Sequence, residues 1–386
     1  MSMPLDLAGP RPRSVLSGRA GLLPRQDIRD LVRRGFLRAA EDIADAQYQP
    51  ASLDLRLGRR AYRVRASFLP GPGSTVEEKL ASLRPDEIDL DGGAVLERGC
   101  VYVVELAEWL ELPESLSAAA NPKSSTGRID VFTRLITDRS EVFDAVEPGY
   151  RGRLYAEVSP RTFSVKVRRG TRLNQIRFRR LNSQQDGSAD FRLSDRDIRE
   201  LHEASRLVDG DLSLRNGLVL RIELAGLGPE RLVGYRAQRH TDVIDAERIA
   251  AYAPGDFWEL IRARPDRRLI LDPNEFYILV SKERLHIPPT HAAEMVPIDP
   301  LMGEFRVHYA GFFDPGFGYA PTGHPGSRAV MEVRSHEVPF NLEDGQMVCR
   351  LAYEAMADEP DALYGAIGTS NYQGQDLKLS KQFRSE

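Results

Sequence analysis

The sequence lacks the features that mark several specialised classes of protein. Only two cysteines occur in 386 residues, Cys100 and Cys349, so neither a disulfide framework nor a cysteine-rich zinc site is expected. No apolar run reaches the roughly 18 residues that span a bilayer. The 53 basic and 57 acidic residues nearly balance, which argues against a dedicated nucleic-acid binder. The first residues contain arginines but no apolar segment, so we predict no secretory signal and a cytoplasmic location.

Several common catalytic motifs are also missing. There is no G-x-S-x-G turn for a serine hydrolase and no G-x-x-x-x-G-K-[ST] phosphate loop. The H-x-E and P-C-x-x-C pair of a zinc deaminase is missing as well. The seven histidines are scattered, and only His286 and His291 are loosely paired. We therefore expect no metal held by protein side chains.

What is present predicts a mainly β protein. The 31 glycines and 25 prolines are spread along the chain, which favours many short elements joined by turns. Leucines alternate with polar residues near residues 49–58, as in a half-buried strand. Strand-like runs follow from residue 95 to residue 180, and again after residue 275. Helices are expected over 24–34, from Ser194 onwards, and over 254–263, and a tail or lid outside the core over about 360–386.

The two halves of the sequence repeat. Tyr102 precedes Pro113 by 11 residues, and Tyr277 precedes Pro288 by the same number. The segment Tyr155-Ala-Glu-Val158 corresponds to Val330-Met-Glu-Val333 in the second half. In each half a glycine follows 13 residues after the glutamate. Such concordant spacing predicts the duplication of one β-rich domain. We place the boundary after residue 208, which gives domains of residues 1–208 and 209–386.

The two copies differ in their polar residues. The first contains Lys123-Ser-Ser-Thr-Gly-Arg128, while the same count in the second copy reaches Asp299-Pro-Leu301. Likewise Gln175 of the first copy corresponds to Arg350 of the second. The first copy is therefore expected to carry the activity and the second to support it.

The segment Lys123–Arg128 concentrates two cations, three hydroxyls and a glycine in six residues. It can offer hydroxyl, backbone and guanidinium donors to a polyanion such as a triphosphate. A polar surface turn is the plainer interpretation, and the segment alone favours it.

Glu157 is the candidate proton carrier. It lies within a predicted strand, and strand alternation puts it on the same face as Tyr155. Burial would raise the pKa of this carboxyl and let it move protons to and from a water. The alternative is a solvent-facing strand glutamate. Glu332, in the copy without the polar segment, is expected to be structural.

In order, these segments resemble the metal-independent dCTP deaminases of the dUTPase-like superfamily, in their long duplicated bacterial form. The resemblance covers most of residues 25–180 and the last 25 residues. It rests on Gln49–Gly58, Lys123–Arg128, Glu147–Gly152 leading to Glu157, Asn174–Phe178, Tyr364, Ser370–Gln375 and Ser380-Lys381.

The resemblance implies two tandem dUTPase-like β-barrel domains of β-clip or jelly-roll type, with a few short helices. It implies hydrolysis of dCTP to dUTP and ammonia, in the supply of dUTP for dTTP synthesis. Glu157 would activate water, without zinc, and the triphosphate would arrive with Mg²⁺. The residues holding the phosphates would be Lys123, Ser124, Ser125, Thr126, Gly127 and Arg128.

The remaining substrate contacts are also implied by the resemblance. The backbone at Tyr155 and Ala156 would read the pyrimidine edge, with Gln175 nearby. Glu147 would lie near the sugar, where the family has aspartate. Three tail residues would cover the nucleotide: Tyr364, Asn371 and Gln375. The expected partners are dCTP, dUTP and dTTP as an inhibitor, in a trimer-based homo-oligomer that binds neither nucleic acid nor membrane.

Two alternatives stay open. One is a dUTPase, or a bifunctional enzyme that also removes pyrophosphate and releases dUMP. The aspartate of the G-x-x-D-x-x-Y-x-G context of a dUTPase is missing, because Glu147 stands there. The other is a nucleotide-binding protein on the same fold without catalysis.

Overall fold

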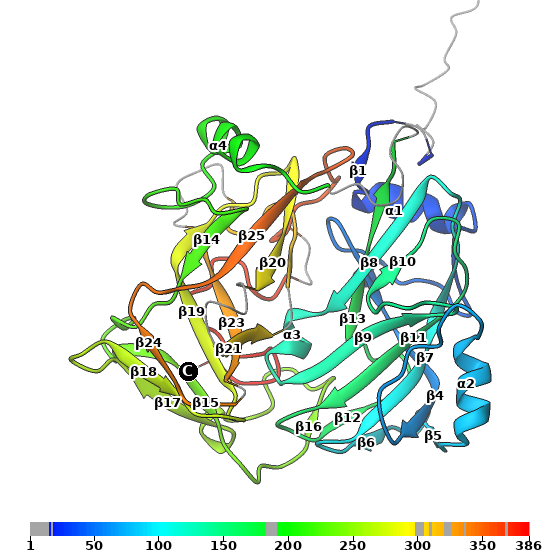
Figure 1. Ribbon diagram of the computed structural model, residues 1–386, viewed down its shortest axis with the longest axis horizontal. Coiled ribbons are helices and arrows are strands. Elements are labelled where there is room, and N and C mark those ends of the chain that lie inside the picture. The colour runs from blue at the N-terminus through cyan, green and yellow to red at the C-terminus, as the bar shows by residue number, and fades with distance from the viewer. Residues whose placement is uncertain are drawn as a thin grey trace, which may run out of the picture.

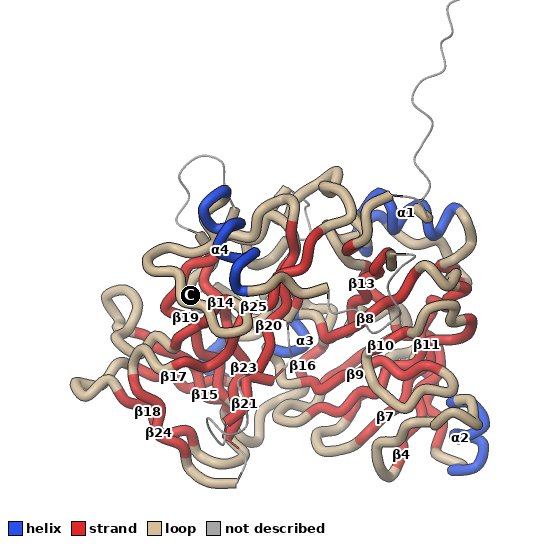
Figure 2. Tube along the Cα trace, turned by 45° about the horizontal axis from the view of Figure 1, so that its top comes forward, coloured by secondary structure: helices blue, strands red, loops and turns tan. Residues whose placement is uncertain are grey.

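The computed structural model describes residues 15–16, 18–182, 191–297, 305–308, 311–319, 326–335, 337–366 and 370–385. Two mainly β halves lie side by side, and a short helix sits between them (Figure 1). Strands dominate both halves (Figure 2). The predicted fold class is thereby confirmed.

The helices are few and short. Two of the expected ones are present: the first follows Pro24, and the last begins after Ser194, whose hydroxyl accepts from the Asp197 amide. The helix expected over 254–263 is wrong, because Trp258–Arg262 pairs as a strand with Leu232–Ala237. The helices are α1 (Arg25–Arg33), α2 (Val76–Leu83), α3 (Ser124–Gly127) and α4 (Asp195–Ala204), with 3₁₀ turns at Asp45–Gln47 and Pro254–Asp256.

The first half contains two main sheets and a small one. One has the order β5-β4-β7-β11-β9, with β2 on β7, and the other the order β1-β13-β8-β10, with β3 on β13. Strands β6 and β12 pair separately. The bounds are β1 (Gly21–Leu22), β2 (Leu37–Ala39), β3 (Leu53–Leu55), β4 (Leu57–Val64), β5 (Asp86–Asp89), β6 (Ala94–Leu96), β7 (Val101–Glu111), β8 (Leu116–Pro122), β9 (Val131–Thr137), β10 (Ala145–Val146), β11 (Arg151–Pro160), β12 (Val165–Val167) and β13 (Asn174–Arg180).

The second half repeats this topology. Its sheets have the orders β17-β15-β19-β23-β21 and β14-β25-β20-β22, with β18 paired to β24. The strands of these sheets thus occupy the places of strands in the first half, as duplication requires, while β16 has no such counterpart and pairs with β12. The bounds are β14 (Leu218–Arg221), β15 (Leu232–Ala237), β16 (Ile244–Asp245), β17 (Trp258–Arg262), β18 (Arg268–Leu271), β19 (Tyr277–Leu285), β20 (His291–Pro297), β21 (Phe305–His308), β22 (Phe312–Phe313), β23 (Ser327–Ser335), β24 (Phe340–Glu343) and β25 (Met347–Ala355).

The repeat places Glu157 and Glu332 at equivalent positions. Glu157 in β11 lies between Val103 of β7 and Arg134 of β9. Glu332 in β23 lies between Ile278 of β19 and His308 of β21. The two glutamates therefore differ only in what each half packs against them.

The first apolar core fills the first half and extends into the second, where Phe257, Trp258 and Ile278 belong to it, and a second apolar core lies in the second half. Ile198 of α4 packs into the core of the second half, although α4 precedes residue 208. The domain boundary after residue 208 stays a prediction. Strand β16 pairs in parallel with β12 of the first half.

The last segment is more buried than expected. Tyr372 packs into the second core, and Phe383 packs into the first. The expectation that 360–386 lies outside the core is wrong for these two residues. The tail thus contacts both halves.

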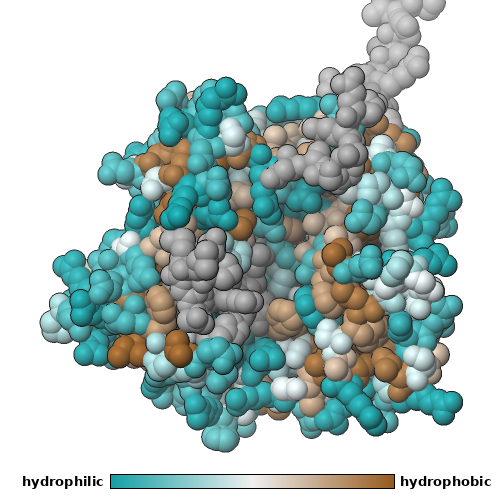
Figure 3. Space-filling model, viewed as in Figure 1, coloured by the Kyte–Doolittle hydropathy of each residue, from teal (hydrophilic) through white to brown (hydrophobic). Residues whose placement is uncertain are grey.

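Polar residues cover most of the face seen in Figure 3. Across the described ranges, no helix has the length and apolar character needed to cross a membrane.

Candidate functional site

A polar cavity lies where the two halves and the tail meet. One wall is the segment after β8, in which Ser125, Thr126 and Arg128 are buried rather than exposed as a surface turn. The Lys123 amide and the Thr126 hydroxyl both donate to the Leu173 carbonyl, each at 2.9 Å. These two bonds hold the segment against the start of β13.

The opposite wall comes from the second half. Strand β23 contributes Val330 and Glu332, and β22 leads into Asp314. Phe313 and Phe317 pack edge to face, with ring centroids 5.1 Å apart, beneath this wall. The cavity is lined by Gln49, Pro122, Lys123, Ser124, Ser125, Arg128, Gln175, Met295, Gly311, Phe312, Phe313, Asp314, Phe317, Val330, Glu332, Tyr364, Asn371, Tyr372 and Gln375.

Glu332 is one of two buried carboxyls that line this cavity, the other being Asp314. The side chain of Glu332 is 6% exposed, and its Oε1 lies 4.0 Å from Nε of Arg128. Burial raises the pKa of Glu332 to about 8, Arg128 opposes the rise, and Asp130 adds to it. A carboxyl with such a pKa can both take up and release a proton near neutral pH.

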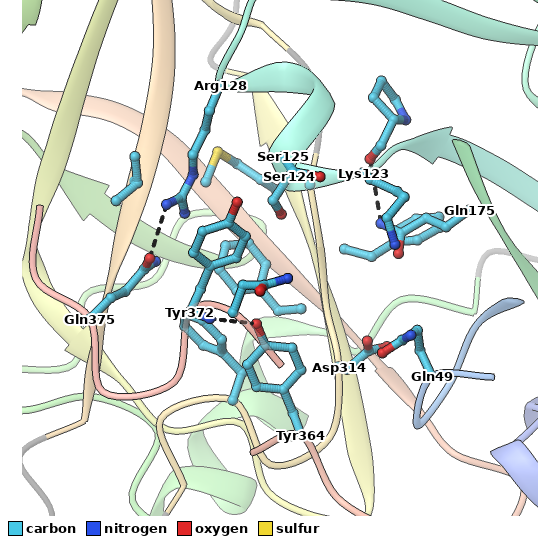
Figure 4. A pocket seen from close by; sticks show the side chains of 18 of the residues that line it. Gln49, Lys123, Ser124, Ser125, Arg128, Gln175, Asp314, Tyr364, Tyr372 and Gln375 are labelled. Carbon is cyan, nitrogen blue, oxygen red and sulfur yellow. Dashed lines mark hydrogen bonds between the residues drawn. The ribbon is translucent and has the colours of Figure 1, made fainter. Parts of the chain in front are cut away.

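The tail closes the cavity. Figure 4 shows Arg128 directed toward Gln375, to whose Oε1 it donates at 3.1 Å. Arg128 also donates to the Lys378 carbonyl at 2.8 Å, and its guanidinium lies 3.9 Å from the centre of the Tyr372 ring. The Tyr364 hydroxyl accepts from the Tyr372 amide at 3.1 Å.

In this closed arrangement the free volume of the cavity is about 90 Å³. Pockets for small molecules usually measure about 300–1,000 Å³. A ligand of nucleotide size therefore needs more room than this closed arrangement leaves.

Lys123 and Gln175 lie on the side of the cavity away from the tail (Figure 4). Lys123 pairs with Asp54, whose side chain is 2% exposed. Gln175 donates from Nε2 to Oδ1 of Asn121 at 3.1 Å.

Of the predicted substrate residues, Lys123, Ser124, Ser125, Arg128, Gln175, Tyr364, Asn371 and Gln375 line the cavity. Thr126 and Gly127 do not line the cavity and are buried within the same turn. The structure therefore brings the first half's polar segment and the tail together, as expected.

Glu157, Tyr155, Ala156 and Glu147 do not line this cavity. Glu147 is exposed on a turn. The Glu157 side chain is 2% exposed and accepts from Arg134 at 3.1 and 2.6 Å. The predicted catalytic residue is thus a buried ion-pair partner elsewhere in the first half.

A segment of the first half covers Glu157. The Ser67 hydroxyl accepts from Nη2 of Arg134 at 2.9 Å. Val76 and Leu80 of α2 pack with Tyr155 on the same side of the sheet. Among the described residues, the hydrogen-bond partner of Glu157 belongs to the first half, whereas the equivalent position in β23, Glu332, faces the cavity.

Two carboxyls that the sequence analysis did not place at the site line the cavity: Asp314 was not singled out, and Glu332 was expected to be structural. Asp314 opens the word Asp-Pro-Gly-Phe, the counterpart of Glu147-Pro-Gly-Tyr, and so supplies the aspartate that the first copy lacks. It is buried, accepts from Nη2 of Arg177 at 3.3 Å, and has a pKa raised by burial. The similarity of these two four-residue segments was the signal in the sequence that could have identified Asp314.

The donor set does not suit a resident metal ion. Within the described ranges, no three His, Cys, Asp or Glu side chains gather as metal ligands. The groups at the cavity are hydroxyls, amides and cations beside two separate carboxyls, which fit an anionic ligand better than a metal ion.

Fold and cavity define a two-domain β protein with a hydrolase-type site, in which a buried carboxyl faces hydroxyl and cationic groups. Residues 19–182 match the family model of the 2'-deoxycytidine 5'-triphosphate deaminase N-terminal domain, and residues 194–383 match that of the C-terminal domain. The chain belongs to the dCTP deaminase family.

Comparisons with individual proteins agree with this family assignment. A crystal structure of 2'-deoxycytidine 5'-triphosphate deaminase from Agrobacterium tumefaciens is 54% identical, with a TM-score of 0.84 over 89% of this chain and 100% of that one. A dCTP deaminase of Halorubrum lacusprofundi is 29% identical over 42% of this chain and 78% of its own. A dUMP-forming dCTP deaminase of Beutenbergia cavernae is 30% identical over 42% and 81%.

Proposed function

We propose that this chain hydrolyses dCTP to dUTP and ammonia at the cavity between its halves, with Glu332 as the proton carrier. The observation that carries the assignment of Glu332 is its position: it is buried, lines the cavity, and lies 4.0 Å from Arg128 of the polar segment. Glu157 has the same place in the repeat but lines no part of this cavity. The role expected for Glu157 therefore passes to Glu332.

The chemistry requires one carboxyl that works in both directions. Ionised Glu332 takes a proton from a water, whose oxygen bonds to C4 of the cytosine ring. The same carboxyl delivers that proton to N3, which gives a neutral tetrahedral adduct, and then carries the proton of the new C4 hydroxyl to the amino nitrogen. The C4–N bond breaks as the C4=O bond forms, and ammonia leaves. One water is consumed, and the ring becomes uracil. A carboxyl with a pKa raised to about 8 suits both proton transfers.

The other residues bind and orient the substrate. Lys123, Ser124 and Ser125 supply a cation and hydroxyls to the triphosphate. Val330 corresponds to Tyr155 in the repeat and lines the cavity two residues before Glu332, so its backbone takes over the reading of the pyrimidine edge. Asp314 takes the place that Glu147 was expected to fill near the sugar.

Mg²⁺ enters this proposal with the substrate. Since the cavity offers hydroxyls and cations and no carboxylate cluster, the ion would be held by the phosphate oxygens and water rather than by the chain. It would neutralise part of the triphosphate charge.

Release of dUMP is the second candidate, because several relatives are named dUMP-forming dCTP deaminases. The products distinguish the two. Inhibition by dTTP and a trimer-based oligomer stay predictions.

The test is a chelator-treated preparation supplied with Mg²⁺ and dCTP, with ammonia and nucleotides followed together. Ammonia with dUTP is expected. Ammonia with dUMP and pyrophosphate would make the enzyme bifunctional. Bound dCTP without ammonia would leave a nucleotide-binding protein and contradict the proposal.

A further inference from the structure

Two pairs of opposite charges join the halves side by side at the cavity. Arg128 faces Glu332, and two residues further along both segments Asp130 binds Arg334. Residues 332 and 334 lie on the same face of β23, since strand side chains alternate. The first half supplies the cation of the first pair and the anion of the second.

We propose that Asp130 and Arg334 are a positioning pair that fixes strand β23 against the Lys123–Asp130 segment and so sets the separation of Arg128 and Glu332. This inference rests on the proposed function, because it assigns the pair a role in the use of Glu332. Neither residue lines the cavity, so both act through their neighbours.

The geometry of Asp130 is specialised for this contact. Asp130 is fully buried and has a φ of +54°, a conformation that few residues other than glycine, asparagine and aspartate adopt readily. Its amide donates to the Gly127 carbonyl at 2.8 Å, which closes the turn after α3. Its carboxylate accepts from Arg334 and, at 2.5 Å, from the Thr162 hydroxyl.

Arg334 is held equally firmly. Its Nη2 also lies 2.6 Å from the Thr162 hydroxyl, and its Nη1 donates to the Asn274 carbonyl at 2.6 Å. By contrast, the Arg128–Glu332 contact is 4.0 Å long. The long contact cannot fix the relative position of the halves, whereas the hydrogen-bonded pair beside it can.

The pair also controls charge near Glu332. The groups that act on or beside this carboxyl are Arg128 and Asp130 of the first half, Tyr372 of the tail and Cys349 of β25. The backbone of His308 pairs with Glu332 from β21. Arg334 neutralises Asp130, the one acidic group among these neighbours.

Removing either partner should therefore move the pH profile in opposite directions. Without Arg334, the unpaired charge of Asp130 disfavours ionised Glu332, and the rising limb of kcat/KM moves to higher pH. Without the charge of Asp130, Arg334 favours ionised Glu332, and the limb moves to lower pH. A pair with a purely structural role would lower stability in both variants without opposite shifts.

The test compares Arg334→Gln, Asp130→Asn and the double variant with the unmodified enzyme. We expect Arg334→Gln to lower kcat about tenfold with KM changed less than about threefold, because Glu332 is displaced while the binding groups stay. The two single variants should shift the rising limb of the kcat/KM pH profile in opposite directions, each by about half a pH unit or more. The double variant, which buries no unpaired charge, should recover to within about threefold.

Arg179→Gln is the matched control. Arg179 joins the halves through Glu354, with contacts of 2.7 and 2.6 Å, and neither residue lines the cavity. Its loss should lower the melting temperature without moving the pH profile. The inference would be overturned if the two single variants shifted the pH profile of kcat/KM in the same direction, or by no more than Arg179→Gln does. It would also be overturned if the kcat of the double variant were no higher than that of the single variants. An unmodified enzyme that releases no ammonia would instead overturn the proposed function.

Discussion

Nε of Arg128 in the first half lies 4.0 Å from Oε1 of Glu332 in the second. This contact joins the polar segment of one repeat to the buried carboxyl of the other. The first half has a buried glutamate of its own, Glu157, but that carboxyl does not line the cavity. Under the proposed function each copy supplies a different part of one site, and we expect one catalytic cavity per chain.

The pH dependence of the reaction should report the burial of Glu332. Its pKa is raised from 4.5 to about 8, mainly by desolvation. Because the ionised form starts the reaction, kcat/KM for dCTP should rise with pH, with the midpoint of the rise near pH 8 and the plateau above it. The folded-state pKa exceeds the unfolded one, so this group's stabilising effect is present below pH 4.5 and is lost as the pH rises through 8. A rise of kcat/KM with its midpoint near pH 4.5 would contradict the assignment of Glu332 as the proton carrier.

The end of the tail should act as an anchor. Phe383 packs against Phe257 and Trp258, with centroids 5.5 and 5.8 Å away. The Ser380 hydroxyl donates to the Ser125 carbonyl at 2.7 Å. Phe383→Ala should raise KM for dCTP about tenfold and change kcat little, because the loosened tail must be ordered at each binding event. Steady-state kinetics measure this.

Phe68→Ala is the control for the tail variant, because Phe68 lies in the small cluster that covers the Glu157 side of the first half. Its KM should stay close to that of the unmodified enzyme. Equal KM values for both variants would show that the anchor has no part in binding.

The stoichiometry of binding should be one nucleotide per chain. The Glu157 carboxyl is covered by Arg134, Ser67 and the cluster beneath α2, so we expect no second nucleotide to reach it. Calorimetric titration of dCTP into Glu332→Gln, which should bind without turnover, measures the ratio. A ratio of two would mean that the Glu157 side also binds.

Stability should depend on the buried cation between the halves. Arg177 is 1% exposed, donates to the Ala293 carbonyl at 3.2 Å and pairs with Asp314. Arg177→Met should lower the free energy of unfolding by about 3 kcal/mol, because Asp314 is left buried without its partner. Urea denaturation measures the change. Arg153→Met, at an exposed pair with Glu105, should change it by less than about 1 kcal/mol.

The sequence predicted much of the fold because its local signals are strong. Pro24 and the capping residue Ser194 mark the starts of α1 and α4, and matched glutamates and glycines mark the repeat. The helix expected over 254–263 failed because tertiary pairing with β15 outweighs the helical spacing of Phe257 and Leu260.

The site was predicted in part. The family resemblance, rather than the residue types alone, predicted that the segment Lys123–Arg128 and the tail share one site, and both contribute to the lining of the cavity. The choice of glutamate depended on which half packs against which, and local sequence does not encode that packing. Asp314 was missed because 18 residues separate it from Glu332, against 10 between Glu147 and Glu157, so fixed counting passed over the matching word.

The most direct measurement is ammonia release from dCTP by Glu332→Gln and Glu157→Gln, prepared and assayed side by side. Glu332→Gln should lose about a thousandfold or more in kcat while still binding dCTP, because the amide cannot carry the proton. Glu157→Gln should keep turnover within about threefold once it is shown to be folded. Turnover retained by Glu332→Gln and abolished in folded Glu157→Gln would contradict the composite site.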